Sequence, residues 1–143
     1  KLVSLQFDFE SMGAYPEGWQ EYNNFETATG KLITEQTLFT PAGRQKISKL
    51  LIEKRKTLIK SWITEMDTMY NVADDSAWIA ENFAACNNKA ELDKMSVRKN
   101  SIVFYKRYCF PHMARPYDID LDIELPLKFL LPCLSDTGRK LLQ

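Results

Sequence analysis

The amino-acid sequence predicts an all-α fold: an up-and-down antiparallel helical bundle with one long central helix and extended terminal segments. Apolar residues with helical spacing run through residues 40–71, and the flanking stretches 16–39 and 89–110 also repeat apolar residues every three or four positions. With 143 residues, 45% of them apolar, the chain is long enough to bury one hydrophobic core. We therefore expect residues 1–143 to form a single helical-bundle domain.

The N-terminal part of the chain is expected to hold an extended arm followed by a helix. Residues 1–11 (KLVSLQFDFES) alternate between apolar and polar side chains, which is typical of a strand. In residues 16–39, Trp19, Tyr22 and Phe25 begin a series of apolar side chains at intervals of three and four. This spacing predicts a helix.

The clearest predicted element is a long helix that begins at Thr40 and Pro41. Threonine is a favoured N-cap residue, and proline suits the first helical position. Apolar side chains then repeat along one face, at Ile47, Leu51, Leu58, Trp62 and Met66. At 1.5 Å per residue the helix would be roughly 45 Å long, which is the length of a bundle's central element.

The C-terminal half is expected to hold two more helices and an extended tail. Residues 75–87 have the spacing of a shorter helix. Residues 89–110 also have helical spacing, although residues 102–110 would equally suit a strand that is apolar on both faces; we favour the helix. Residues 117–125 alternate strictly, which predicts an extended chain, and residues 135–143 would form a last short turn.

Charge is segregated along the chain although 19 basic and 19 acidic residues cancel. Residues 1–39 carry a net charge of −4, residues 40–60 of +6, residues 61–88 of −5 and residues 89–115 of +5. Such blocks give dipolar surfaces that favour oriented association over non-specific binding of nucleic acid. The alternative is that oppositely charged segments pair with one another across helices.

The three cysteines leave the cellular compartment open. Cys86, Cys109 and Cys133 lack the C-x-x-C spacing of a metal site. Three reduced thiols would fit a reducing compartment, and one disulfide with one spare thiol would fit a secreted protein.

The segment DIDLDIE is the sharpest candidate for chemistry. In an extended chain, one face would carry four carboxylates, those of Asp118, Asp120, Asp122 and Glu124. An Asp-x-Asp strand can hold a divalent cation for phosphoryl transfer, as in nucleotidyltransferases. The glycine-serine turn that such enzymes place upstream is missing, so a solvated acidic face is favoured and a metal-dependent transferase fragment built on Asp118 and Asp120 is the alternative.

Other catalytic devices are not indicated by the sequence. His112 is the only histidine, so any serine or cysteine nucleophile would depend on it as the base. No glycine-rich loop suited to phosphate is present. We therefore predict that the protein is not an enzyme and needs neither a cofactor nor a metal.

Two apolar clusters, at residues 101–110 and 125–134, contain more large apolar side chains than one bundle core is expected to bury. An exposed apolar patch rimmed by cations marks a membrane-binding or protein-binding surface. The predicted contact residues are Phe104, Tyr105, Tyr108, Phe110, Leu127, Phe129, Leu130 and Leu131. The predicted basic patch consists of Lys54, Arg55, Lys56, Lys106 and Arg107. The alternative is that both clusters close the core.

The region SIVFYKRYCFPHMARPY, residues 101–117, resembles the helix-to-loop passage of abalone sperm lysin. The resemblance lies in the aromatic pair Phe104 and Tyr105, a charged turn, Met113 and the closing Tyr117.

The likeness extends back through TLFTPAGRQKISKLLIEKRK, where a Thr-Leu-x-Thr sequence leads into the long basic helix. It covers roughly residues 37–117. The chain thus resembles the abalone sperm acrosomal protein family. Its neutral charge, its acidic DIDLDIE segment and its cysteines bring it closer to the fusogenic paralogue than to lysin itself.

This resemblance implies an all-helical, non-enzymatic protein that is secreted from the acrosomal vesicle and acts at the egg surface in fertilization. The implied function is binding and perturbing membranes to promote sperm–egg fusion, with the egg plasma membrane or an egg-surface glycoprotein as the partner. Stoichiometric, lysin-like binding to the egg envelope is the alternative. Weak self-association is a further expectation, and nucleic acid is not an expected partner.

Overall fold

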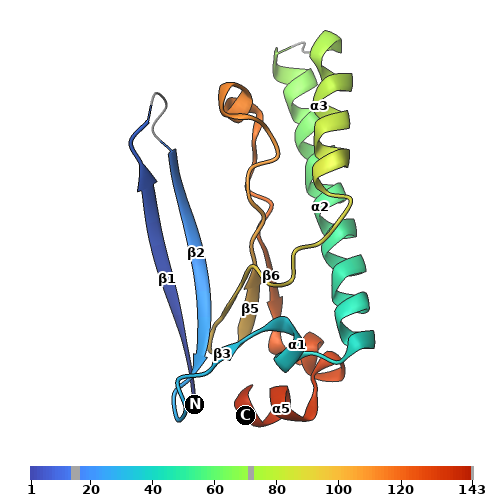
Figure 1. Ribbon diagram of the computed structural model, residues 1–143. Helices are drawn as coiled ribbons and strands as arrows, with labels where there is room; N and C mark the ends of the chain where they lie inside the picture. Colours follow the sequence, from blue (N-terminus) through green and yellow to red (C-terminus); the bar gives the residue numbers. More distant parts are fainter. Residues whose placement is uncertain (14–16, 71–72, 143) are drawn as a thin grey trace.

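The computed structural model describes residues 1–13, 17–70 and 73–142 (Figure 1). Its elements in chain order are β1 (Leu2–Ser11), β2 (Glu17–Glu26), β3 (Leu32–Ile33), α1 (Glu35–Leu38), α2 (Pro41–Tyr70), α3 (Ala73–Cys86), β4 (Met95–Val97), β5 (Ser101–Phe104), η1 (His112–Tyr117), β6 (Ile123–Pro126), α4 (Leu127–Leu130), η2 (Leu131–Cys133) and α5 (Asp136–Leu142). Helices and two antiparallel three-stranded sheets share the chain, so the prediction of an all-α bundle is wrong.

The first sheet has the strand order β1-β2-β3, and its long hairpin replaces the helix predicted for residues 16–39. The β1–β2 register runs without interruption from Leu2 opposite Glu26 to Ser11 opposite Glu17. The N-terminal segment is a strand, as its alternation predicted. It also supplies a hydrogen-bonding partner for residues 17–26, which the spacing within that segment could not reveal. Residue 16 lies outside the described residues.

The second sheet has the order β4-β5-β6 and replaces the helix predicted for residues 89–110. All residues of β5 are buried, because β5 is the central strand and is covered on both faces. The apolar run at residues 101–104 is therefore the strand that was the alternative interpretation. The extended segment predicted for residues 117–125 becomes a strand only from Ile123 onward.

The central helix and the shorter helix after it are confirmed as α2 and α3. The side-chain oxygen of Thr40 accepts a hydrogen bond of 2.9 Å from the backbone N–H of Gly43, which is the geometry of an N-cap. The two helices lie side by side as a helical hairpin on one side of the molecule, while the β1–β2 hairpin stands on the other side (Figure 1).

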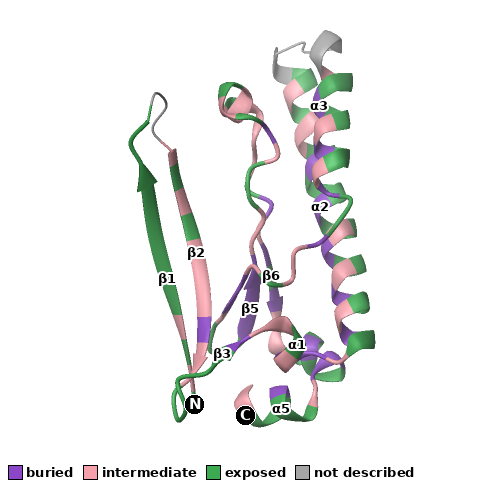
Figure 2. Ribbon diagram, in the orientation of Figure 1, coloured by how far each residue is buried: buried purple, intermediate pink, exposed green. Residues whose placement is uncertain are grey.

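Among the described residues, most buried apolar side chains belong to one of two clusters; Figure 2 marks the buried positions. The larger cluster joins the N-terminal half of α2 to the second sheet and to the C-terminal helices, with Leu51, Phe39 and Phe104 among its members. The smaller cluster lies further along α2, where Ile59 and Phe83 meet the loop that follows β5.

Two glycines let the C-terminal segment pack tightly against the rest of the chain. A Cβ at Gly43 would lie 2.9 Å from the Cα of Cys133, and one at Gly138 would lie 2.9 Å from the carbonyl carbon of Leu38. Both neighbours are backbone atoms, which cannot rotate away as a side chain could. The close approach of α2 to η2 and of α5 to α1 therefore requires glycine at these positions.

Candidate binding surfaces

Three of the predicted contact residues are buried. Phe104 is fully covered in β5, Phe110 belongs to the smaller core cluster, and Leu130 belongs to the larger one. Treating residues 101–110 as a helix put Phe104 on an outward face, whereas the strand is covered on both faces. These three side chains therefore serve the core.

The other predicted contact residues do not form one patch. Tyr105 and Leu127 are partly buried, and Tyr105 stacks on Tyr22 with ring centroids 3.7 Å apart. Tyr108, Phe129 and Leu131 are exposed to 56%, 64% and 41%. Tyr108 belongs to the loop after β5, whereas Phe129 and Leu131 belong to the C-terminal α4–η2 segment.

The predicted basic patch is divided in a similar way. Lys54 and Lys56 are exposed, and Lys56 pairs with Glu53 at 2.9 Å. Lys106 lies 3.4 Å from Glu91, with its side chain only 6% exposed. Arg107 is exposed and lies 3.0 Å from Glu21.

Arg55, the remaining member of that patch, is fully buried. It lies on the same helical face as Leu51 and Ile59, four residues away on each side, and therefore points into the protein. Its Nε donates to the carbonyl oxygen of Leu121 at 2.9 Å.

The Nη2 atom of Arg55 donates to the carbonyl oxygens of Phe104 and Tyr105, each at 3.2 Å. Burial lowers the pKa of the guanidinium, and the charges of Asp122 and Glu91 oppose that shift. The side chain is thus a brace between α2 and the segments on either side of the 105–121 loop.

The carboxylates of DIDLDIE also organise this loop. Asp118 accepts hydrogen bonds from the backbone N–H groups of Cys109 and Phe110, at 2.8 and 3.2 Å. Asp122 accepts one from the backbone N–H of Lys106, at 2.9 Å. The Oδ1 atom of Asp120 accepts one from the N–H of Asp122, at 2.8 Å.

Residues 118–122 precede β6, so Asp118 and Asp120 do not stand on the strand that the transferase alternative required. Glu124, on β6 itself, accepts from Arg98 and from the hydroxyl of Ser101. Among the described residues, no group of three or more histidine, cysteine or acidic side chains is arranged to hold a metal ion.

The stability of the Asp122→Asn variant relative to the wild type is expected to depend on pH. Burial raises the pKa of the Asp122 carboxyl above its ordinary value of 3.8, and the N–H of Lys106 and the charge of Arg55 oppose this shift. The folded state therefore holds the proton more tightly than the unfolded chain. The carboxyl contributes most to stability below about pH 3.8, and this contribution is lost as the pH rises through the folded-state pKa.

Urea unfolding at a series of pH values measures this dependence. The free energy of unfolding of the wild type minus that of the variant should decrease as the pH rises from about 3.8. A difference that grows with pH would mean that the native structure stabilises the carboxylate instead.

Cys86 and Cys109 form a disulfide, with their Cα atoms 5.4 Å apart. The bond joins the last residue of α3 to the loop after β5. Cys133 is a buried free thiol. The spacing of the cysteines allowed either three thiols or one bridge, and only the folded chain shows which residues are near enough to pair.

One face of the N-terminal hairpin is an exposed apolar feature outside the predicted contact residues. Val3, Leu5, Phe7 and Phe9 alternate along β1 and share this face, and each is 39–42% exposed. We call this set, together with its cross-strand neighbours Phe25 and Trp19, the outer hairpin face. Phe9 and Trp19 stack with ring centroids 5.3 Å apart.

The opposite face of the hairpin holds it to the rest of the protein. The hydroxyls of Ser4 and Ser96 are 2.9 Å apart, and the Asn24 side-chain amide donates to the carbonyl oxygen of Met95 at 2.9 Å. Burial, a hydrogen bond and charge interaction with Tyr105, and nearby carboxylates raise the pKa of Tyr22 to about 12. Since Ser4, Tyr22 and Asn24 all face inward, the outer hairpin face points away from the second sheet.

The charges on the outer hairpin face are paired. Glu17 and Glu21 occupy odd-numbered positions of β2 and so share this face with the apolar side chains. Glu17 lies 3.0 Å from Arg115, and Glu21 lies 3.0 Å from Arg107. The surface is therefore an apolar stripe whose neighbouring carboxylates are neutralised by cations of the 105–117 region.

Sequence reasoning recognised the alternation of β1 but assigned no function to it. The signal was present, because a bundle of four helices has no obvious place for a strand with a purely apolar side. In addition, within the described ranges no helix is both long and apolar enough to cross a bilayer.

Comparison with the models of known protein families and with curated proteins finds no match to this chain.

Proposed function

We propose that this chain is a non-enzymatic secreted protein that binds reversibly to membrane surfaces through the outer hairpin face. The observation that carries the proposal is the row Val3, Leu5, Phe7 and Phe9, in which each side chain keeps about two-fifths of its surface in water. Contiguous exposed apolar surface of this kind is a mark of partner or membrane contact.

The chemistry of the surface favours a lipid interface. Aromatic side chains such as those of Phe9 and Trp19 suit the boundary between water and hydrocarbon. Because Glu17 and Glu21 are paired with arginines, the face presents little uncompensated negative charge to the headgroups. The open edge of β1 can remain in the hydrated headgroup region, where water satisfies its backbone groups.

The expected affinity is low. Fully burying one large apolar side chain contributes about 1.5–3 kcal/mol, so burying the remaining two-fifths of four such side chains contributes on the order of 3 kcal/mol. This supports peripheral, reversible binding rather than insertion. Perturbation of the bilayer would then depend on the local concentration of protein.

The disulfide supports secretion, since such bonds persist in oxidising compartments. Action at the egg surface, whether by fusion or by binding to the egg envelope, stays a prediction from the resemblance. The mixed fold contradicts the helical bundle which that resemblance implied. The membrane proposal therefore rests on the outer hairpin face.

Sedimentation with phosphatidylcholine vesicles tests the proposal, with lipid in large excess over protein. The wild type should sediment with the vesicles, and the Phe7→Ser, Phe9→Ser double variant should stay in the supernatant. Phe129→Ser is the matched control, because Phe129 is exposed to 64% on the C-terminal α4 helix. Circular dichroism confirms that the variants keep their secondary structure.

A wild-type protein that stays in solution at all lipid concentrations would contradict the proposed function. A second candidate surface is Phe129 and Leu131, since the ammonium group of Lys128 lies 5.6 Å from the ring centroid of Phe129. Loss of sedimentation in Phe129→Ser, with binding kept in the double variant, would assign the contact to that surface instead.

A further inference from the structure

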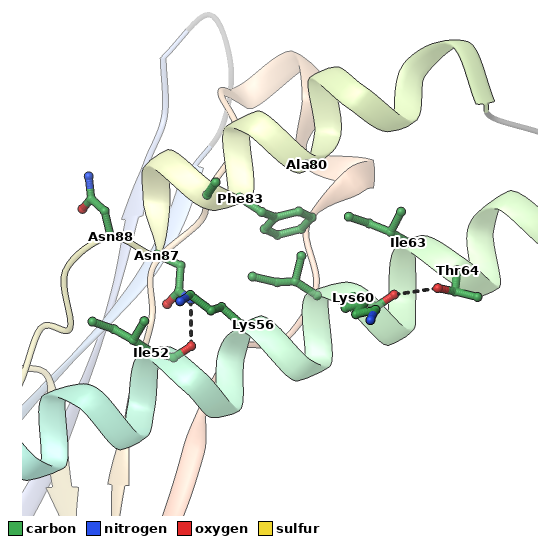
Figure 3. Close-up of a pocket in the computed structure, with 11 residues that line it drawn as sticks. Ile52, Lys56, Lys60, Ile63, Thr64, Ala80, Phe83, Asn87 and Asn88 are labelled. Atoms are coloured by element: carbon green, nitrogen blue, oxygen red, sulfur yellow. Dashed lines mark hydrogen bonds between the residues drawn. The ribbon is translucent and has the colours of Figure 1, made fainter.

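A second apolar surface lies between α2 and α3, away from the outer hairpin face (Figure 3). It is a groove with a cavity volume of about 500 Å³, within the range of small-molecule sites. Its apolar lining comes from both helices and includes Ile52, Ile59, Ile63 and Phe83. The α2 residues that line it run from position 52 to position 64, a length of roughly 18 Å along the helix axis.

The charged groups that line the groove are all cations. Lys56 and Lys60 contribute to its lining, and among the residues that the structure describes no acidic side chain does so. Both lysines are exposed, so their ammonium groups are accessible to a ligand from the solvent side. Lys56 also pairs with Glu53, which lies outside the groove. The groove thus combines an apolar interior with a cationic rim.

A buried polar atom marks one end of the groove. Asn87 is only 3% exposed, and its side-chain nitrogen donates to the carbonyl oxygen of Ile52 at 3.0 Å. Its Oδ1 atom is buried and has no hydrogen-bond partner among the described residues. An unsatisfied buried acceptor is costly, so a small shift of the amide that opens Oδ1 to a ligand hydroxyl in the groove would be favoured.

The two ends of the groove differ in the polar groups that they offer to a ligand. Asn87 and Asn88 lie near Ile52 and Lys56, whereas Ile63, Thr64 and Ala80 lie towards the other end (Figure 3). The hydroxyl of Thr64 donates to the carbonyl oxygen of Lys60 at 3.0 Å, so its proton is already bound within the helix. A ligand that matches this gradient has an anionic, hydroxyl-bearing head and one aliphatic chain.

We propose that the α2–α3 groove binds a single-chain anionic amphiphile as a free monomer, a lysophosphatidate being the type. The chain lies between the helices along Ile59, Ile63 and Phe83. The phosphate meets Lys56 and Lys60, and the glycerol hydroxyl donates to Oδ1 of Asn87. This inference is independent of the outer hairpin face, because no residue of that face lines the groove.

Isothermal titration calorimetry with lauroyl lysophosphatidate, below its critical micelle concentration, tests the site. The decisive variant is Ala84→Leu, because Ala84 lines the groove from an exposed helical position and the added side chain would occupy the chain's space. Its matched control is Ala85→Leu, which is also exposed on α3 but lies outside the groove. Affinity should fall about tenfold or more in the first variant and change less than about twofold in the second.

The headgroup is tested by two further measurements. The Lys56→Gln, Lys60→Gln double variant should bind lauroyl lysophosphatidate about tenfold more weakly, and Lys49→Gln, Lys54→Gln is the control pair that leaves the groove lining unchanged. Dodecyltrimethylammonium, which has a cationic head, should not bind.

Three results would overturn the proposal. They are equal binding of the two amphiphiles, equal losses of affinity in Ala84→Leu and Ala85→Leu, and no binding of lauroyl lysophosphatidate to the wild type. In the Phe7→Ser, Phe9→Ser background, which removes the outer hairpin face, binding of phosphatidic acid vesicles without binding of the monomer would show that the phosphate source is a bilayer and would also overturn the proposal. None of these outcomes depends on Phe7 or Phe9. Failure of the groove is therefore distinguishable from failure of membrane binding.

Discussion

Replacing Arg55 by alanine is expected to lower the free energy of unfolding by about 3 kcal/mol, because it removes the donor of three carbonyl oxygens. The guanidinium donates to the carbonyl oxygens of Leu121, Phe104 and Tyr105. Without the guanidinium, these carbonyl oxygens lose their hydrogen-bond donor. Because Arg55 is fully buried, this loss occurs in the interior of the protein. Each buried acceptor left unsatisfied costs about 1–3 kcal/mol.

Part of this cost is offset in any Arg55 variant. Burial lowers the pKa of the guanidinium, which shows that the charged group is itself disfavoured by its surroundings. Its Nη1 atom is also buried without a hydrogen-bond partner among the described residues. Both Arg55→Ala and Arg55→Met remove these two penalties, but Arg55→Met also keeps most of the aliphatic packing, so its loss of stability should be smaller than that of Arg55→Ala.

Urea denaturation measures both losses. Lys54→Ala provides the control, because Lys54 is the neighbouring basic residue and is exposed, so its replacement should change stability by less than about 0.5 kcal/mol. If Arg55→Ala and Lys54→Ala proved equally stable, the guanidinium would not be the brace between α2 and the 105–121 loop.

Removal of the disulfide is the second large effect. The Cys86→Ser, Cys109→Ser double variant should lose about 3 kcal/mol, as expected for a bond that closes a loop between residues 23 apart in sequence. The cross-link restricts the unfolded chain, so its loss favours unfolding even if every native contact remains. The measurement is the unfolding free energy of the double variant.

The control is Cys133→Ala, which leaves the cross-link intact. Cys133 is a buried free thiol, so its replacement removes packing only. Reducing agent should destabilise the wild type and Cys133→Ala to a similar extent and should leave the double variant unchanged. Insensitivity of the wild type to reduction, with equal stability of the double variant, would argue that the bond is absent in solution.

The elements that could be predicted were those whose signals are local. The N-cap at Thr40 and the proline after it marked the start of α2, because capping depends on neighbouring residues alone. The strict alternation of residues 1–11 likewise marked β1.

The errors came where a spacing was compatible with two structures. Trp19, Tyr22 and Phe25 recur every three residues, yet they lie on a strand whose two faces have different partners. Trp19 stacks on Phe9 of the neighbouring strand, and Tyr22 stacks on Tyr105 of a distant loop. The spacing of three therefore arises from apolar residues on both faces of β2, and it was mistaken for one apolar face of a helix.

The candidate surfaces show the same division. The apolar character of Val3, Leu5, Phe7 and Phe9 was readable from their alternation, but their exposure was not, because exposure depends on whether another layer covers them. The prediction for Arg55 was wrong in the opposite direction, because this residue was expected to be exposed and is buried. A charged residue in a basic run is usually solvated, and only the carbonyl oxygens brought to it by the folded chain make its burial possible.

The long α2 helix, the α3 helix and the N-terminal strand can be predicted from the amino-acid sequence, since hydrogen bonds and side-chain periodicity within a short stretch specify them. The two sheets, the Cys86–Cys109 pairing and the division of aromatic residues between core and surface become apparent only in the folded chain. Each of these depends on groups far apart in the chain. Strand partners, bond-forming distances and burial are properties of pairs of segments, and no single segment contains them.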